Sequence, residues 1–295
     1  MPGGKRTDRI SERDLEVLEF IGRYGVVPRD AVGVWAGTAK TATQTRERRL
    51  ALAGLIEVAN PWQGAGPFAV ATRAGLGACL RDELPVAEIS PSNLQHHAVC
   101  ARLGARLERA GRQILSEREL RAEERAWGKR VHSIQLRTRL HRPDLMILPA
   151  AAESERESDR STSAVIHSES GSSASDLGRQ GPSSSRTQGG RRGERTLVRE
   201  RADRTEDTEM RSAPGVSKSI AVEVELTRKA QGRLEEIVRR WRAAVDEGRF
   251  QRVLYYCTSE VLPYVQRAVD RARAEEQVTA ELIPDEDVLV TSLFG

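Results

Sequence analysis

The hydrophobic pattern of the first 90 residues predicts three short helices followed by a β-hairpin. Ser11 fits the N-cap of a first helix with Asp14 three residues later, and Thr38 fits the cap of a third helix. Helical and alternating spacing of the apolar residues defines the remaining bounds. We expect helices over residues 11–25, 29–36 and 38–53, and strands over residues 55–58 and 68–71. This order of elements is typical of a winged helix-turn-helix.

A second region is organised around the stretch SIAVEVELTRK at residues 219–229, which alternates strictly between aliphatic and other side chains. Alternation with a period of two predicts a half-buried strand. Glu223 and Glu225 then share one face of the strand, opposite the aliphatic side chains. Two interpretations are open: either the glutamates are solvated on a face that is open to water, or a divalent cation lies between the two carboxylates.

The other elements of the second region are helices and short strands. A long amphipathic helix is expected from Ser92 to about Ala110, and residues 135–148 count as one strand with a kink at Pro143. Further strands are expected over residues 113–116, 252–257 and 278–283, and further helices over residues 228–247 and 259–274. The order is helix, three strands, helix, strand, helix, with a final strand, which makes the predicted fold class α+β.

Residues 151–217 differ in composition from the regions on either side. Ten residues between Ser161 and Gly190 are serine, and aliphatic residues are few. Such a segment buries too little apolar surface to offset its ordering entropy, so we predict a disordered insertion between two strands of one sheet. The predicted organisation is therefore a first domain at residues 1–90 and a second domain at residues 91–150 and 218–295.

Composition indicates the cellular compartment and adds little else to this picture. Lys and Arg number 47 against 43 acidic residues, a net charge of +4, and no apolar run reaches the length of a membrane span. The N-terminus MPGGKRTDRI lacks an apolar run, so no signal peptide is expected and the chain is assigned to the cytoplasm. Cys79, Cys100 and Cys257 are interpreted as reduced thiols without zinc spacing, and His96 and His97 as surface or capping residues.

The third predicted helix carries side chains that bind phosphates and base edges in a major groove. Its residues expected to be exposed are Lys40, Thr41, Thr43, Gln44, Arg46, Arg48 and Arg49. The turn-rich segment before residue 68, with Trp62, Gln63, Gly64 and Gly66, could reach the adjacent backbone as a wing. We therefore predict DNA contacts at Lys40, Thr41, Gln44, Arg46 and Arg48, with a protein-partner surface as the alternative.

Two short motifs lie at the strands of the second region, RPDLMIL at residues 142–148 and AVEVELTRK at residues 221–229. With the predicted order of elements, they resemble the PD-(D/E)xK nuclease superfamily. Combined with an N-terminal winged helix, the same motifs resemble the replication-relaxation family, whose members are linked to plasmids, conjugative elements and phages. The resemblance covers roughly residues 10–148 and 218–275.

This resemblance implies a metal-dependent site. In the superfamily the aspartate and the first acidic residue of the second motif bind metal, and a lysine two residues later assists the attacking water. Here Glu225 stands at the lysine position, in an E-x-E pattern that also resembles active restriction enzymes. The implied catalytic residues are Asp144, Glu223, Glu225 and Lys229, with Mg²⁺ or Mn²⁺ held by Asp144, Glu223 and Glu225. Glu108 or Glu117 could complete the ligand shell.

Three functions follow from these expectations. The first is a DNA-binding protein of a mobile element that acts in replication or DNA relaxation, with a nuclease-like second domain. The second is a metal-dependent DNA nuclease or nickase targeted by its winged helix. The third is a transcriptional regulator whose second domain dimerises. The expected partners are double-stranded DNA, a second copy of the chain, and replication or conjugation proteins, without a membrane.

Overall fold

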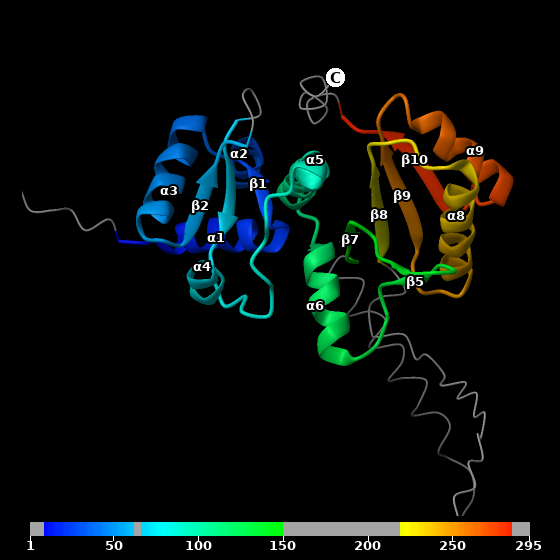
Figure 1. The fold of residues 1–295 in the computed structure, drawn as a ribbon, viewed down its shortest axis with the longest axis horizontal. Helices are drawn as coiled ribbons and strands as arrows, with labels where there is room; N and C mark the ends of the chain where they lie inside the picture. Colours follow the sequence, from blue (N-terminus) through cyan, green and yellow to red (C-terminus); the bar gives the residue numbers. More distant parts are fainter. Residues whose placement is uncertain (1–8, 62–65, 150–218, 285–295) are drawn as a thin grey trace, which may run out of the picture. The chain divides into compact units, whose positions relative to one another are not determined.

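The computed structural model describes residues 9–61, 66–149 and 219–284, which all fall within one compact unit. The fold is a mixture of helices and mixed sheets, so the predicted α+β class is confirmed (Figure 1). The predicted insertion at 151–217 and the wing residues 62–64 lie outside the described residues. No helix among the described residues combines the length and the apolar character needed to cross a membrane.

The N-terminal part contains helices around a small antiparallel sheet. Its helices are α1 (Glu12–Tyr24), α2 (Arg29–Ala36), α3 (Lys40–Leu52) and α4 (Arg73–Ala78). Its strands are β1 (Val26–Pro28), β2 (Ile56–Ala59) and β3 (Phe68–Ala71), in the order β1-β3-β2. The capping box of Ser11 with Asp14 is present as predicted, whereas β1 was not expected from the sequence.

Thr38 does not cap α3, which corrects the prediction. The N-cap is Ala39, and no side chain caps the helix. The Thr38 hydroxyl instead lies 3.0 Å from the hydroxyl of Thr43, which also donates to the carbonyl of Ala39. The two threonines therefore join the turn after α2 to the first turn of α3.

The second part is a five-stranded mixed sheet with helices on both faces. Its helices are α5 (Pro91–Arg109), α6 (Glu117–Trp127), α8 (Gln231–Asp246) and α9 (Leu262–Ala272). Its strands are β4 (Ile114–Ser116), β7 (Leu145–Ile147), β8 (Ile220–Glu225), β9 (Arg252–Cys257) and β10 (Val278–Leu282). Strands β4, β7 and β8 are antiparallel neighbours, and β8, β9 and β10 run parallel because α8 and α9 cross between them.

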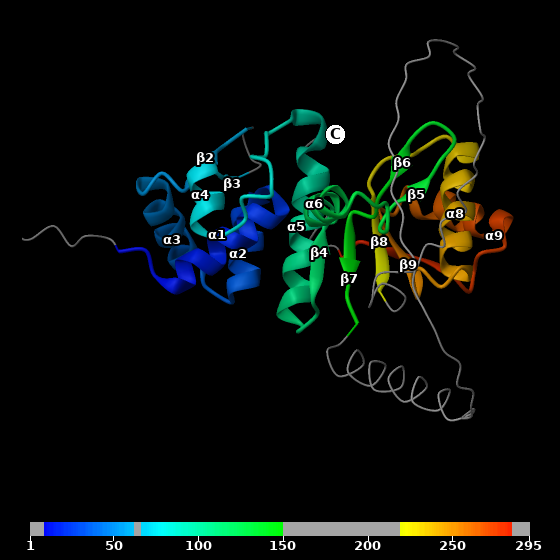
Figure 2. The ribbon, with the colours of Figure 1, turned by 90° about the horizontal axis from the view of Figure 1, so that it is seen from below.

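Two elements of this part differ from the prediction. Residues 135–148 do not form one kinked strand: β5 (Ile134–Gln135) and β6 (Leu140–His141) form a separate hairpin, which lies beside α8 (Figure 2). Residues 117–127 form α6, which the sequence analysis left unassigned although Ser116 and Glu119 make a capping box. The high charge of this helix concealed its narrow apolar stripe.

Helix α5 packs against both parts. It contacts α2 and β1 on the N-terminal side and β8 in the second sheet. One buried apolar cluster accordingly includes Leu18 of α1, Val99 of α5 and Val222 of β8. A second cluster, with Ala221, Trp241 and Tyr255, fills the opposite face of the sheet under α8 and α9.

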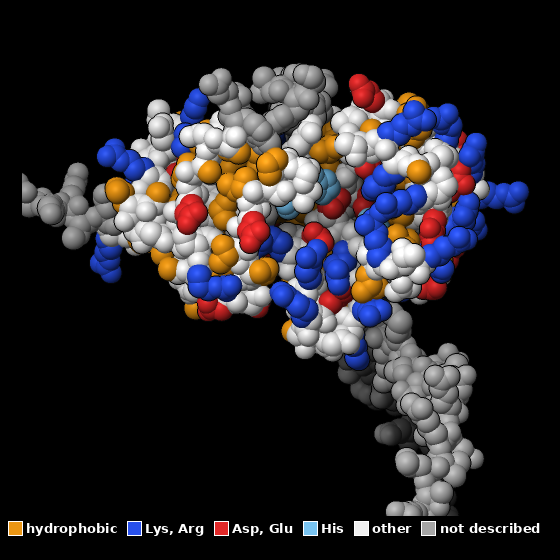
Figure 3. Space-filling model, in the orientation of Figure 1, with side chains coloured by type: hydrophobic (Ala, Val, Ile, Leu, Met, Phe, Trp, Pro, Cys, Tyr) orange, Lys and Arg blue, Asp and Glu red, His pale blue; other side chains and the backbone are white. Residues whose placement is uncertain are grey.

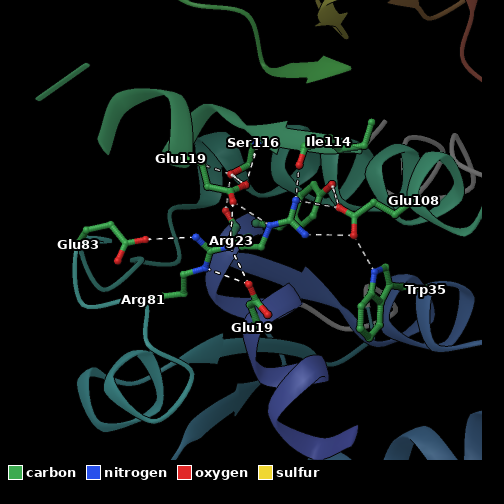
Figure 4. A network of polar contacts seen from close by, with 10 residues as sticks. Glu19, Arg23, Trp35, Arg81, Glu83, Glu108, Ile114, Ser116 and Glu119 are labelled. Atoms are coloured by element: carbon green, nitrogen blue, oxygen red, sulfur yellow. Dashed lines mark hydrogen bonds and ion pairs between the residues drawn. The ribbon is translucent and has the colours of Figure 1, made fainter. Parts of the chain in front are cut away.

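A buried guanidinium fastens α1 to the second part (Figure 4). Arg23 Nε donates to Glu119 Oε1 at 2.9 Å, its Nη1 donates to Glu108 Oε2 at 3.1 Å, and its Nη2 donates to the carbonyl of Ile114. Glu108 also accepts from the Tyr24 hydroxyl at 2.7 Å and from the Trp35 indole at 2.8 Å. The side chains of Arg23 and Glu119 are only 13% and 5% exposed.

Replacing Arg23 with Met should lower the free energy of unfolding by about 3–5 kcal/mol, because the half-buried Glu108 loses its cation and the buried Glu119 keeps only the longer contact with Arg81. Arg23→Lys should restore part of this loss, since it keeps the charge but not the fork of donors. Urea unfolding measures both. Arg121→Ala, which removes an ion pair of α6 whose arginine is 52% exposed, should cost at most about 0.5 kcal/mol. A loss below about 1 kcal/mol for Arg23→Met would contradict the role given to this network.

Candidate functional site

The two glutamates of β8 are buried. Glu223 is 3% exposed and Glu225 is 5% exposed, with the side chains of His141 and Lys229 packed against them. The interpretation with solvated glutamates on a water-exposed face is therefore wrong. A buried carboxylate needs a cation or hydrogen-bond donors to offset its lost hydration.

Asp144 lies at the end of β8 that β7 leaves uncovered. Strand β7 has three residues and β8 has six, so β8 continues beyond the pair of Leu145 with Val222. The N–H of Val224, which lies beyond the pairing with β7, donates to Asp144 Oδ2 at 2.7 Å. The N–H of Asp144 donates to the carbonyl of Val222. The aspartate side chain thus replaces the missing ladder partner and is fixed beside the glutamates.

Each of the three predicted carboxylates has its own basic neighbour. Asp144 Oδ1 lies 3.0 Å from His96 Nε2, and Glu223 Oε1 lies 3.0 Å from His141 Nε2. Glu225 forms an ion pair with Lys229. The structure therefore brings all four predicted catalytic residues into one group of pairs, which joins α5, β6, β8 and the turn before α8.

The pKa shifts show how these charges influence one another. Burial raises the pKa of Glu223 and of Glu225, and the nearby His141 and Lys229 oppose this effect only in part. Burial alone would raise the pKa of Asp144, but His96 and the Val224 N–H lower it. Burial alone would lower the pKa of Lys229, but the charges of Glu225 and Glu223 raise it, so Lys229 carries its charge at neutral pH.

The buried hydroxyl of Tyr255, which stands opposite Glu223 in the pairing of β8 with β9, has no hydrogen-bond partner among the described residues. A buried atom of this kind indicates a missing water, ion or ligand. The neighbouring carboxylate oxygens fit a hard cation such as Mg²⁺ or Mn²⁺ by their chemistry, and this cofactor stays a prediction.

The sequence did not predict a second set of side chains around Asp144, formed with His96 and Cys100. His96 Nε2, Cys100 Sγ and a carboxylate oxygen of Asp144 lie within 4.8 Å of one another, and they form the one such set of three among the described residues. His96 and Cys100 stand four residues apart, so they share one face of α5. This spacing was visible in the sequence, and the statement that no cysteine has ligand spacing to a histidine was wrong.

Glu108 is not part of this site. Its carboxylate is held by Arg23, Tyr24 and Trp35 in the network of Figure 4, at the far end of α5 from His96. Glu117 starts α6, where its carboxylate pairs with Arg121 and its N–H donates to the carbonyl of Asp144. Glu117 therefore supports the backbone of Asp144.

On α3 the structure divides the predicted DNA contacts into two groups. Lys40, Thr41, Gln44 and Arg48 are exposed. Thr43 is buried, and Arg46 and Arg49 are half-buried because both reach back to Asp14 at 2.9 Å and 2.7 Å. The expectation of an exposed Thr43, Arg46 and Arg49 is corrected: the two arginines hold α3 on α1, and Thr43 joins α3 to the turn after α2.

A pocket of about 660 Å³ adjoins the first turn of α3. Its charged lining consists of Arg29, Asp30, Lys40, Arg102 and Arg109. Arg29 pairs with Glu47 and Arg102 pairs with Asp30, yet Nη1 of the buried Arg102 has no hydrogen-bond partner among the described residues. The pocket therefore presents a net positive lining with one buried donor left over, which suits an anionic group.

Comparison of the chain with protein-family models, with curated proteins and with solved structures finds no match. The assignment of function consequently depends on the geometry of the residues described above and on the short motifs of the sequence.

Replacing Asp14 with Asn should lower stability at pH 7 by about 1–3 kcal/mol and weaken its dependence on acid. Burial would raise the pKa of Asp14, but hydrogen bonds from Ser11 and Arg49 and the charge of Arg49 lower it. A lowered folded pKa gives stability that is present above the unfolded pKa and is lost as the pH falls through the folded value. Urea unfolding at pH 7 and at about pH 3 measures this difference.

The matched control is Asp270→Asn, a change at an exposed position of α9 that should leave the pH profile unchanged. Equal acid sensitivity of the Asp14→Asn variant and the native chain would reject the inferred charge pairing of Asp14.

Proposed function

We propose that this chain binds double-stranded DNA through α3 and carries a nuclease-like second part, as a protein of a mobile element that acts in replication or DNA relaxation. The observation that carries the proposal is the orientation of α3. Its inward charges are fixed on Asp14, while Lys40, Thr41, Gln44 and Arg48 are free to meet a nucleic acid. Side chains of these types contact phosphates and base edges.

A winged helix-turn-helix is the proposed form of the N-terminal part. Helices α1, α2 and α3 are followed by the β2–β3 pair, and β1 completes a three-stranded antiparallel sheet. In this arrangement α3 takes the position of the recognition helix. The positive pocket beside its first turn would receive a backbone phosphate, and Lys40 belongs to both surfaces.

The nuclease-like assignment is supported by topology. Helix α5 is followed by the antiparallel strands β4, β7 and β8, with α6 and the β5–β6 hairpin between β4 and β7, and then by α8 and the parallel strand β9. Apart from α6 and this hairpin, this is the order of elements that the resemblance to the PD-(D/E)xK superfamily implies, with Asp144 before β7 and Glu223 on β8. The link to mobile elements depends on the resemblance of RPDLMIL and AVEVELTRK to the replication-relaxation family.

A metal-dependent nickase is the second candidate, and the position of Lys229 favours it. The motif has Glu225 where the superfamily has its lysine. The ammonium group of Lys229 pairs with Glu225, and the charge of Glu223 also raises the pKa of Lys229. A cation is therefore present beside the acidic pair although it comes from a later residue. A bound Mg²⁺ or Mn²⁺ would supply Lewis-acid chemistry, while Asp144 and Glu223 would hold it and Lys229 would orient a phosphate or water.

Removing three exposed contacts of α3 together, Lys40→Ala, Gln44→Ala and Arg48→Ala, should weaken DNA binding at least tenfold. It should also lower the slope of log affinity against log salt by about two units, because two phosphate charges are lost. Fluorescence anisotropy of the full chain with labelled duplex DNA over a salt series measures both. The control variant carries Arg267→Ala and Arg271→Ala on α9, which removes two exposed charges from another surface. An equal loss in both variants would place the binding elsewhere than α3.

The nickase candidate predicts slow, Mn²⁺-stimulated conversion of supercoiled plasmid to open circles by the native chain. Asp144→Asn and Lys229→Met should each reduce the rate at least tenfold, while the exposed Lys129→Met should not. Unchanged duplex binding by each variant would show that only the chemistry is affected. A native chain that binds DNA but nicks it no faster than the Asp144→Asn variant would reject this candidate and leave the DNA-binding proposal standing.

A further inference from the structure

Three side chains with different donor atoms converge at the junction of α5 and β7. His96 Nε2 lies 3.0 Å from Asp144 Oδ1 and 3.5 Å from Cys100 Sγ, and all three ligand atoms lie within 4.8 Å of one another. The histidine and the cysteine come from one turn of α5, and the aspartate comes from the turn that leads into β7.

We propose that His96, Cys100 and Asp144 form a binding site for a zinc-class transition-metal ion, with one coordination position left open. This site shares Asp144 with the proposed nuclease-like centre, but its ligand set is different and its formation requires neither DNA nor Glu223.

The distances agree with the edges of a metal tetrahedron. Zinc bonds of about 2.0–2.1 Å to nitrogen and about 2.3 Å to sulfur place the two ligand atoms about 3.6 Å apart at the tetrahedral angle. The observed Nε2–Sγ separation is 3.5 Å. The corresponding nitrogen–oxygen edge is about 3.4 Å, so the 3.0 Å contact of His96 with Asp144 needs to open only slightly.

The hydrogen bonds of the metal-free arrangement do not explain the cluster. One ring nitrogen, His96 Nε2, faces both the carboxylate and the sulfur, and its single proton can align well with only one of them. A metal ion at the position of this proton bonds all three groups at once. The ligand types also select the ion, because a thiolate and an imidazole favour zinc-class metals over Mg²⁺.

The surroundings hold the ligands in place. Asp144 Oδ2 accepts the N–H of Val224 at 2.7 Å, so Oδ1 is the carboxylate oxygen that points to the ring of His96. The side chain of Cys100 is buried in the apolar cluster of α5, which excludes water from the sulfur. Such outer contacts orient metal ligands and raise affinity.

The fourth position is open to solvent or to a substrate oxygen. No fourth His, Cys, Asp or Glu side chain in the described parts of the chain joins the set within the same distance. The side chain of His96 is 36% exposed, and histidine side chains reach the surface beside acidic ones on the face shown in Figure 3. Three protein ligands with an open position are the arrangement of catalytic rather than structural zinc.

Titration of the metal-free full chain with Co²⁺, in the absence of DNA, tests the site. Co²⁺ bound by a thiolate gives a near-ultraviolet charge-transfer band, and we expect this band to saturate at one ion per chain and to vanish when Zn²⁺ is added. Cys100→Ser should abolish the band. His96→Ala and Asp144→Asn should weaken Zn²⁺ binding by more than the roughly 10–100-fold that the loss of an outer contact costs.

Two matched controls are Cys79→Ser at the C-cap of α4 and His97→Ala, the neighbour of His96 on α5; both should bind Co²⁺ like the native chain. A second readout is thermal unfolding, where Zn²⁺ should raise the midpoint of the native chain and of Cys79→Ser but not of Cys100→Ser. No charge-transfer band in the native chain, or a band that survives Cys100→Ser, would overturn the proposal. Because these measurements contain no DNA, failure of the DNA-binding proposal would leave their outcome unchanged.

Discussion

The buried charge of Arg23 is the constraint on which the arrangement of the described residues depends. A guanidinium in the interior must find carboxylates, and Arg23 finds Glu108 at the end of α5 and Glu119 at the start of α6. Its backbone carbonyl accepts from Ser116, so β4 is fixed as well. The next residue, Glu117, donates its N–H to the carbonyl of Asp144. Successive polar contacts therefore connect Asp144 of the candidate site to α1.

Local signals in the sequence account for much of the fold. The capping pair of Ser11 with Asp14, the helical spacing of residues 29–36 and the alternation of residues 220–225 each act over a few neighbours, and the structure shows the expected helices and strand there. Elements that depend on partners far away in the chain were harder to predict from the sequence. Strand β1 exists because it pairs with β3, and residues 135–148 divide into a hairpin and a strand because α8 and β8 offer separate partners.

The candidate site shows the same division. Alternation placed Glu223 and Glu225 on one face, but their burial and their partners His141 and Lys229 arise from the packing of β6 and of the turn before α8. The inward direction of Arg46 and Arg49 was hidden for a similar reason, since Asp14 lies on another helix. The pair of His96 with Cys100 was accessible through its helical spacing, whereas its meeting with Asp144 was not.

The pairing of Ile147 with Ile220 brings the two ends of a long connection to adjacent strands. A connection whose ends already meet adds little to the free energy of closing the sheet when it lengthens, because the entropic cost rises only with the logarithm of its length. The junction of β7 and β8 can therefore accept insertions or a whole foreign domain while Asp144 and β8 keep their register. The register that holds Asp144 beside β8 is set by the three residue pairs of β7 with β8, whatever the length of the connection between them.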